Sequence, residues 1–166
     1  LARGRRVERS HGQTAAPDSL NVPTAAPPIE TGALILGAGP VGLFQAFELG
    51  LHDIRAHIVE ALPFAGGQCA ELYGDKPIYD IPGIPSCTGR ELTERLLQQL
   101  APLAPTFHFN QLLSTLAACE DGRWEACTDQ GTRFLARTIF IAAGVGAFLP
   151  RKLTTPGIEA FEGRQL

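Results

Sequence analysis

Three glycines are the residues of this sequence whose spacing points most directly to chemistry. Gly37, Gly39 and Gly42 form a G-x-G-x-x-G turn directly after the apolar segment 33–36. In such a turn the first glycine permits a sharp bend, the second lets the backbone approach a pyrophosphate, and the third lets a helix pack closely on a sheet. Pro40 suits the first position of that helix, whose N-terminal N–H groups would face the phosphates. The segment therefore predicts a nucleotide-phosphate site.

A glycine-rich turn also occurs without any ligand, so the residues that follow it matter. Residues 54–59 alternate between apolar and polar and predict a second strand, which ends at Glu60. A carboxylate at this spacing accepts the ribose hydroxyls of an adenosine, and it would repel the 2′-phosphate of NADP. Gly66 and Gly67 follow, where another loop must pass close to the cofactor. His57 is interpreted as a surface position of the strand.

Composition excludes several classes of protein. The chain has 166 residues, of which 45% are hydrophobic, enough for the core of one domain. Its net charge of −3 and the absence of any basic face argue against nucleic acid as a partner, and no apolar run is long enough to cross a membrane. The four cysteines show no C-x-x-C and no metal-ligand spacing. We therefore expect reduced packing cysteines in a cytoplasmic protein and no metal site.

The ends of the sequence predict a fragment with an unstructured start. Residues 1–30 are rich in Arg, Ala, Pro and Ser and predict a disordered leader. The chain has no methionine, even at position 1, and stops without a terminating pattern, so we expect part of a longer protein.

The middle of the chain predicts a helix, a long loop and a second helix. In the helix over residues 40–51, we expect the face that covers the sheet to consist of Val41, Phe44, Phe47 and Leu51.

Residues 66–83 read as a functional loop, in which Gln68 offers a donor and an acceptor and Tyr73 a flat ring for stacking. The alternative is a structural loop whose tyrosines cover the core. Thr88 and Glu91 form a capping box that starts a helix ending before Pro102.

The remaining segments predict strands. Residues 106–109 read as a short buried strand, and three alternating segments, 112–119, 123–128 and 132–137, are separated by turn signals and predict an antiparallel meander. Residues 138–144 read as a central parallel strand, whose carboxyl end at Ala143 and Gly144 should meet the cofactor. The predicted fold is α/β and Rossmann-like, with a parallel central sheet plus a three-stranded antiparallel meander.

The order of these motifs resembles the flavin-binding half of the two-dinucleotide flavoproteins, which include thioredoxin reductases. Three segments, 66–73, 76–83 and 142–153, are similar to the thioredoxin-reductase-like, type 2 ferredoxin (flavodoxin)–NADP⁺ reductases. The similarity covers residues 31–166.

This resemblance implies bound FAD, hydride transfer between NADPH and the flavin, and single-electron exchange with ferredoxin or flavodoxin. It implies that Glu60 binds the adenosine ribose, Gln68 the flavin side and Leu113 the adenine region, while Tyr73 stacks on the isoalloxazine and Phe148 lines the flavin pocket. No acid, base or nucleophile of the chain is needed.

The resemblance also implies a division of the chain. Residues 31–150 would form the FAD-binding domain, and residues 151–166 the start of a crossover to an NADP-binding domain that this sequence lacks. We expect the fragment alone to hold FAD weakly and to oxidise no NADPH. Family members are usually dimers, so a homodimer is expected at full length. Two alternatives stay open: a thioredoxin-reductase-like flavoprotein with another acceptor, and a non-catalytic nucleotide-binding fragment. Cys69 is interpreted as a packing residue.

Overall fold

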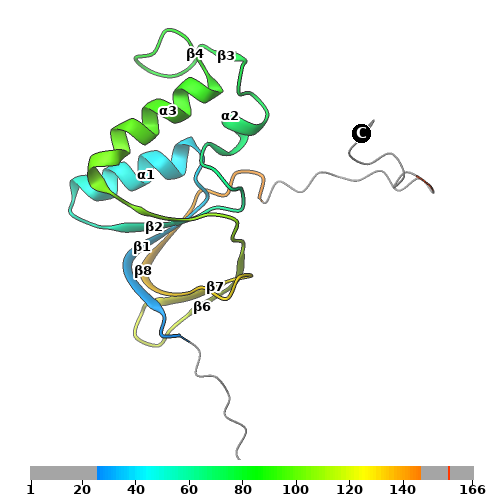
Figure 1. Ribbon diagram of the computed structural model, residues 1–166. Coiled ribbons are helices and arrows are strands. Elements are labelled where there is room, and N and C mark those ends of the chain that lie inside the picture. Colours follow the sequence, from blue (N-terminus) through cyan, green and yellow to red (C-terminus); the bar gives the residue numbers. More distant parts are fainter. Residues whose placement is uncertain (1–25, 147–156, 158–166) are drawn as a thin grey trace, which may run out of the picture.

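The computed structural model describes residues 26–146 and Gly157 (Figure 1). The predicted site residue Phe148 lies outside them, as do most of the predicted leader and of the predicted crossover. The elements are, in order, β1 (Ile29–Leu36), α1 (Pro40–Leu51), β2 (Ala56–Val59), α2 (Gly67–Glu71), β3 (Pro77–Ile78), β4 (Cys87–Thr88), α3 (Gly89–Leu100), a 3₁₀ turn (Ala101–Leu103), β5 (Thr106–His108), β6 (Leu113–Ala118), β7 (Trp124–Thr128) and β8 (Arg133–Ile141).

One six-stranded sheet organises the molecule, with strand order β5-β2-β1-β8-β7-β6. The pairs β5–β2, β2–β1 and β1–β8 are parallel. The pairs β8–β7 and β7–β6 are antiparallel, and β7 pairs with the first half of β8. The predicted fold class, a parallel sheet plus a three-stranded meander, is therefore confirmed. The predicted boundary between the third meander strand and the central strand is wrong, because 133–141 is one continuous strand that belongs to both. β3 and β4 form a separate two-stranded pair.

The helices lie together on one face of the sheet, as Figure 1 shows. Beneath them the buried side chains of β1, β2, α1 and α3 form a core, including Ile35, Leu43, Ile58 and Leu100. The capping box predicted for α3 is present, because Thr88 Oγ1 accepts from the Glu91 N–H at 3.2 Å and the Glu91 carboxylate accepts from the Thr88 N–H at 2.8 Å.

The predicted inner face of α1 is wrong. Val41, Phe44 and Leu51 are exposed, and only Phe47 packs partly on the core. The buried face consists of Gly42, Leu43, Ala46 and Leu49. The reason is that α1 is apolar nearly all round, so two sets of positions fit helical spacing. The contact that selects one of them is Gly42, where an added Cβ would lie 1.9 Å from the Gly37 carbonyl oxygen.

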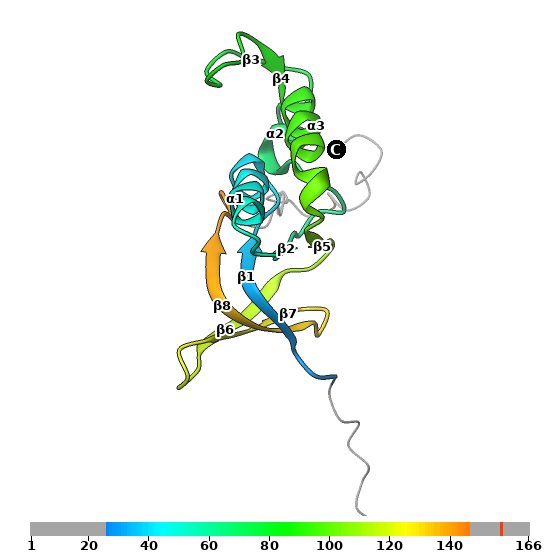
Figure 2. The ribbon, with the colours of Figure 1, turned by 90° about the vertical axis from the view of Figure 1, so that its left-hand side faces the viewer.

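The meander curls over the opposite face of the sheet, where β6 and β7 cross β1 and β8 (Figure 2). A second core forms there around the fully buried Phe134. The rings of His57 and His108 contact Phe134 edge-on. They also stack on each other, with 5.2 Å between the ring centres. His57 is therefore half-buried, not a surface residue as predicted, and β5 is a partly exposed edge strand, not a buried one.

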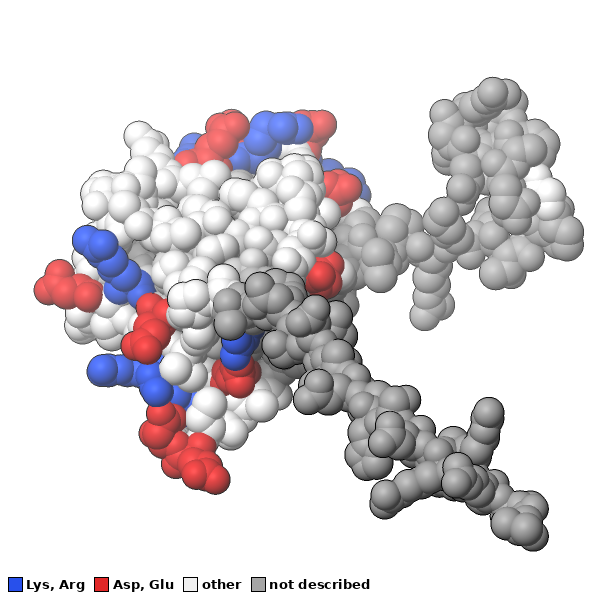
Figure 3. All heavy atoms as spheres, turned by 60° about the horizontal axis from the view of Figure 1, so that its bottom comes forward, with Lys and Arg blue, Asp and Glu red and all other residues white. Residues whose placement is uncertain are grey.

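Acidic and basic side chains are interspersed on the face shown in Figure 3, and neither sign gathers into one patch. Several pair with each other, as in the contact between Arg123 and Asp121 at 2.7 Å. None of the helices in residues 26–146 combines the length and the apolar character needed to span a bilayer.

Candidate functional site

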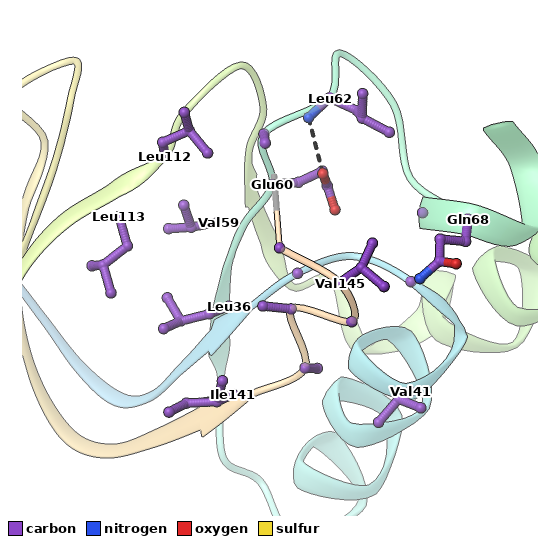
Figure 4. A pocket seen from close by; sticks show the side chains of 18 of the residues that line it. Leu36, Val41, Val59, Glu60, Leu62, Gln68, Leu112, Leu113, Ile141 and Val145 are labelled. Atoms are coloured by element: carbon purple, nitrogen blue, oxygen red, sulfur yellow. Dashed lines mark hydrogen bonds between the residues drawn. The ribbon is translucent and has the colours of Figure 1, made fainter. Parts of the chain in front are cut away.

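A cavity of about 730 Å³ lies at the carboxyl ends of β1, β2 and β8 (Figure 4). This is the edge at which open α/β sheets bind their ligands, and the volume is typical of a cofactor site. The sequence-predicted residues that line it are Gly37, Gly39, Pro40, Glu60, Gly67, Gln68, Tyr73, Leu113, Ala143 and Gly144. Gly42 lies behind this wall, in the contact between α1 and the sheet.

Three loops meet at the cavity because glycines allow their backbones to touch. Gly37 has φ of +105°, and an added Cβ would lie 2.5 Å from the Ala142 carbonyl oxygen. Gly67 has φ of +52°, and its added Cβ would lie 3.2 Å from Gly39 Cα. The sharp turn predicted at Gly37 is therefore present. Gly67 lies against the glycine-rich turn, and its approach to the cofactor stays a prediction.

Gly39 differs from these neighbours. Its backbone is extended, with φ of −70°, so any residue could adopt it. An added Cβ would meet no atom of the described residues within 4 Å. Neither the backbone conformation nor the packing of the described residues calls for glycine here, and a side chain would instead project into the open space beside the cavity.

The first turn of α1 carries two backbone donors next to that space. Pro40 has no N–H, and the Leu43 N–H donates to the Gly39 carbonyl at 2.9 Å. Between them, the N–H groups of Val41 and Gly42 have no acceptor among the residues that the structure describes. Two such donors at the positive end of a helix form a site for an anion such as a phosphate.

Glu60 is buried and is held by two backbone bonds. Its carboxylate accepts from the Ala38 N–H at 2.7 Å and from the Leu62 N–H at 2.9 Å. These bonds leave lone pairs on both oxygens, because an ionised carboxylate has about four acceptor positions. Glu60 is therefore a positioned acceptor beside the cavity.

The predicted loop 66–83 is partly helical, since α2 occupies residues 67–71. Helix α2 places Gln68 at one end of the cavity, well separated from Leu113 in Figure 4. Gly144 lies against this residue, because its added Cβ would be 3.2 Å from Gln68 Nε2. Tyr73 also lines the cavity, and the ammonium of Lys76 lies 5.1 Å from the centre of its ring.

Cys69 lines the cavity as well, which the sequence analysis did not anticipate. Partial burial raises the pKa of its thiol, and the nearby Cys87 raises it further. The thiol therefore stays protonated at neutral pH.

Other cavity residues were missed because they carry no motif. The apolar wall includes Leu36, Val59, Leu112, Leu116 and Ile141, whose types match any core position. Gln111 also lines the cavity and follows Asn110, which has a positive φ of 56°. Asn tolerates this conformation better than most residues, but the sequence alone offers no sign that the next side chain meets a ligand.

Comparison with known proteins agrees with the geometry. No family model matches the chain. It is 62% identical over 139 residues to the ferredoxin–NADP reductase of Albidiferax ferrireducens, covering 84% of this chain and 39% of the relative. It is 64% identical over 138 residues to the enzyme of that name from Verminephrobacter eiseniae, again covering 39% of it. The chain thus spans about two fifths of the length of these relatives.

Solved structures share the fold. Lactococcus lactis thioredoxin reductase superposes with a TM-score of 0.61 at 22% identity, covering 79% of this chain and 40% of that one. A cyclohexanone monooxygenase superposes with a TM-score of 0.66 at 19% identity, covering 82% and 30%. The resemblance found in the motifs is confirmed: the chain is a relative of the ferredoxin–NADP reductases in sequence and has the fold of the thioredoxin reductases.

Proposed function

We propose that this chain forms the FAD-binding part of a reductase that passes electrons between NADPH and ferredoxin or flavodoxin. The observation that carries the proposal is the open space at Gly39, next to two N–H groups of α1 that have no acceptor among the described residues. This space lies in the glycine-rich turn of a chain that is about 60% identical to proteins named ferredoxin–NADP reductase.

The pyrophosphate of FAD would lie at the first turn of α1. There the N–H groups of Val41 and Gly42 would donate to phosphate oxygens, and the helix dipole would favour the negative charge. Gly39 would let the phosphate approach the backbone. No basic side chain is required for this, because the donors are backbone groups.

The adenosine would lie toward Glu60 and Leu113. Glu60 would accept from ribose hydroxyls with the lone pairs that Ala38 and Leu62 leave free. The same carboxylate would repel a 2′-phosphate, so the NADPH of the proposed reaction is assigned to another part of the protein.

The flavin would lie toward Gln68 and Tyr73. The amide of Gln68 has both a donor and an acceptor for the polar edge or ribityl chain of a flavin, and the ring of Tyr73 would stack on the isoalloxazine. When bound, FAD supplies the redox chemistry by accepting a hydride and releasing single electrons. The residues proposed here position it and exclude water. Phe148, outside the described residues, is proposed for the same pocket.

Several features of the whole protein are part of the proposal. They are the boundary of the FAD-binding unit at residues 31–150, a crossover at 151–166 toward an NADP-binding domain, a homodimer, and a cytoplasmic location. They follow from the resemblance described above and extend beyond the part of the relatives that this chain spans.

The test of the acceptor is a turnover assay with the protein expressed from its complete natural gene. We expect NADPH-dependent reduction of ferredoxin or flavodoxin, and no comparable reduction of a protein or small-molecule disulfide. Preferential reduction of the disulfide would show that the protein is a flavoprotein with another acceptor. If none of these acceptors supported NADPH oxidation, the proposed partner would be refuted.

A further inference from the structure

Gln111 lies in the wall of the cavity at a position held from both sides. Its own N–H donates to the Glu60 carbonyl at 3.0 Å, and the next N–H, that of Leu112, donates to the Asp129 carboxylate at 2.8 Å. The backbone on which this side chain stands is therefore tied to the end of β2 and to the turn after β7. Gln111 is adjacent in space to the residue proposed to bind ribose.

A buried threonine sets the orientation of the Gln111 amide. Thr128 is only 2% exposed, and its hydroxyl oxygen accepts from the Thr132 N–H at 3.1 Å. The hydroxyl proton is then free to donate, and Gln111 Oε1 lies 2.9 Å away as its acceptor. Because the carbonyl oxygen is engaged, the NH₂ group of the amide is left as the available donor. Within residues 26–146 this NH₂ group has no hydrogen-bond acceptor.

We propose that Gln111 is a specificity-determining residue, whose Nε2 donates a hydrogen bond to the adenosine half of the bound dinucleotide. A ribose hydroxyl both donates and accepts, as does the edge of adenine. Glu60 can only accept, so a second group that donates completes the recognition of this half. This inference rests on the proposed function and names a residue that selects FAD over flavins lacking adenosine.

The experiment compares the affinities of the complete protein for FAD and FMN, with and without the substitution Gln111→Leu. FMN has the flavin and one phosphate but no adenosine. The loss of one neutral hydrogen bond should weaken FAD binding about three- to tenfold, while FMN binding stays unchanged. Gln98→Leu, the same substitution on an exposed position of α3, is the matched control and should change neither affinity. Flavin fluorescence titration of the apoprotein measures both, and thermal melting shows whether each variant is folded.

A second variant guards against a folding defect. Gln111→Asn keeps an amide but shortens it by one methylene, so it cannot reach Thr128 and the ligand together; it should also lower FAD affinity and leave FMN affinity unchanged. Equal losses for FAD and FMN would show a merely structural role and overturn the inference. So would unchanged FAD binding in either variant. If the unaltered protein bound no flavin, the proposed function itself would fall, and this inference with it.

Discussion

The substitution Gly39→Val separates the needs of a ligand from the needs of the fold. Because the backbone at Gly39 is extended and a Cβ there meets no atom of the described residues within 4 Å, this part of the fold can accept a side chain. Glycine also loses more conformational entropy on folding than other residues, so replacing it stabilises the folded state. This gain offsets part of any stability lost because valine caps the helix less well. The free energy of unfolding should change by less than about 1 kcal/mol.

The effect on the ligand should be large. A branched side chain at Gly39 would occupy the space through which the pyrophosphate reaches the N–H groups of Val41 and Gly42. Each hydrogen bond to a charged group contributes about 1.5–3 kcal/mol, so losing both should cost at least about 3 kcal/mol, or a factor of more than a hundred in affinity. Titration of the apoprotein with FAD and urea unfolding measure the two quantities.

Gly42→Ala is the contrasting variant. Its Cβ would lie 1.9 Å from the Gly37 carbonyl oxygen, a backbone atom and not the end of a flexible side chain. We expect a loss of stability of about 1–3 kcal/mol, the usual cost of overpacking.

Unchanged FAD affinity in Gly39→Val would refute the placement of the phosphate. Unfolding of Gly39→Val would refute the conclusion that the fold leaves this position open.

Three further predictions concern single side chains. Glu60→Gln should lower stability by about 1–3 kcal/mol, measured by urea unfolding, because an amide NH₂ would face one of the two backbone donors; an unchanged midpoint would contradict the bonding described. Thr88→Ala should cost about 1 kcal/mol by removing the cap of α3, with FAD affinity unchanged in the folded protein, whereas a loss of affinity would link the cap to the site. Burial lowers the pKa of both His57 and His108, and for His57 the neighbouring His108 lowers it further. Their unfolded forms therefore bind protons first as pH falls, and thermal stability should decrease below about pH 6.5. His108→Phe should reduce this dependence, and an identical pH profile would show that the pair is not its source.

The roles of the first and third glycines could be predicted from the sequence because they are steric requirements of the turn itself. Gly37 and Gly42 are in contact with each other and with the strand that precedes them, so their spacing along the chain determines their geometry. Glu60 could be predicted for a similar reason, since a strand of regular length carries it to the same edge of the sheet. These are short-range relations, and regular secondary structure preserves them.

The inner face of α1 could not be predicted, because the choice is made by tertiary contact. Two apolar faces compete in this helix, and the close approach at Gly42 turns Leu43 and Ala46 inward. The continuity of β8 was missed for a related reason. Pairing with β1 over residues 29–36 draws the third meander strand and the central strand into line, and local sequence contains no sign of that partner.

The contribution of Gln111 to the site could also not be predicted from the sequence. Gln111 reaches the cavity because Thr128, some distance along the chain, holds its amide. A glutamine in a loop is common and indicates no function by itself. Only the buried Thr128 hydroxyl orients the Gln111 amide. Likewise, His57 Nδ1 lies 2.9 Å from His108 Nε2 only because β2 pairs with β5.

We propose above that the cavity at the glycine-rich turn holds FAD. The most direct measurement is the visible absorbance spectrum of the protein purified from its complete natural gene, with the released cofactor identified by chromatography. We predict a flavin spectrum, release of FAD in close to one equivalent, and bleaching on addition of NADPH. A colourless protein that binds NAD would contradict the claim, because the turn and Glu60 would then serve a nicotinamide cofactor.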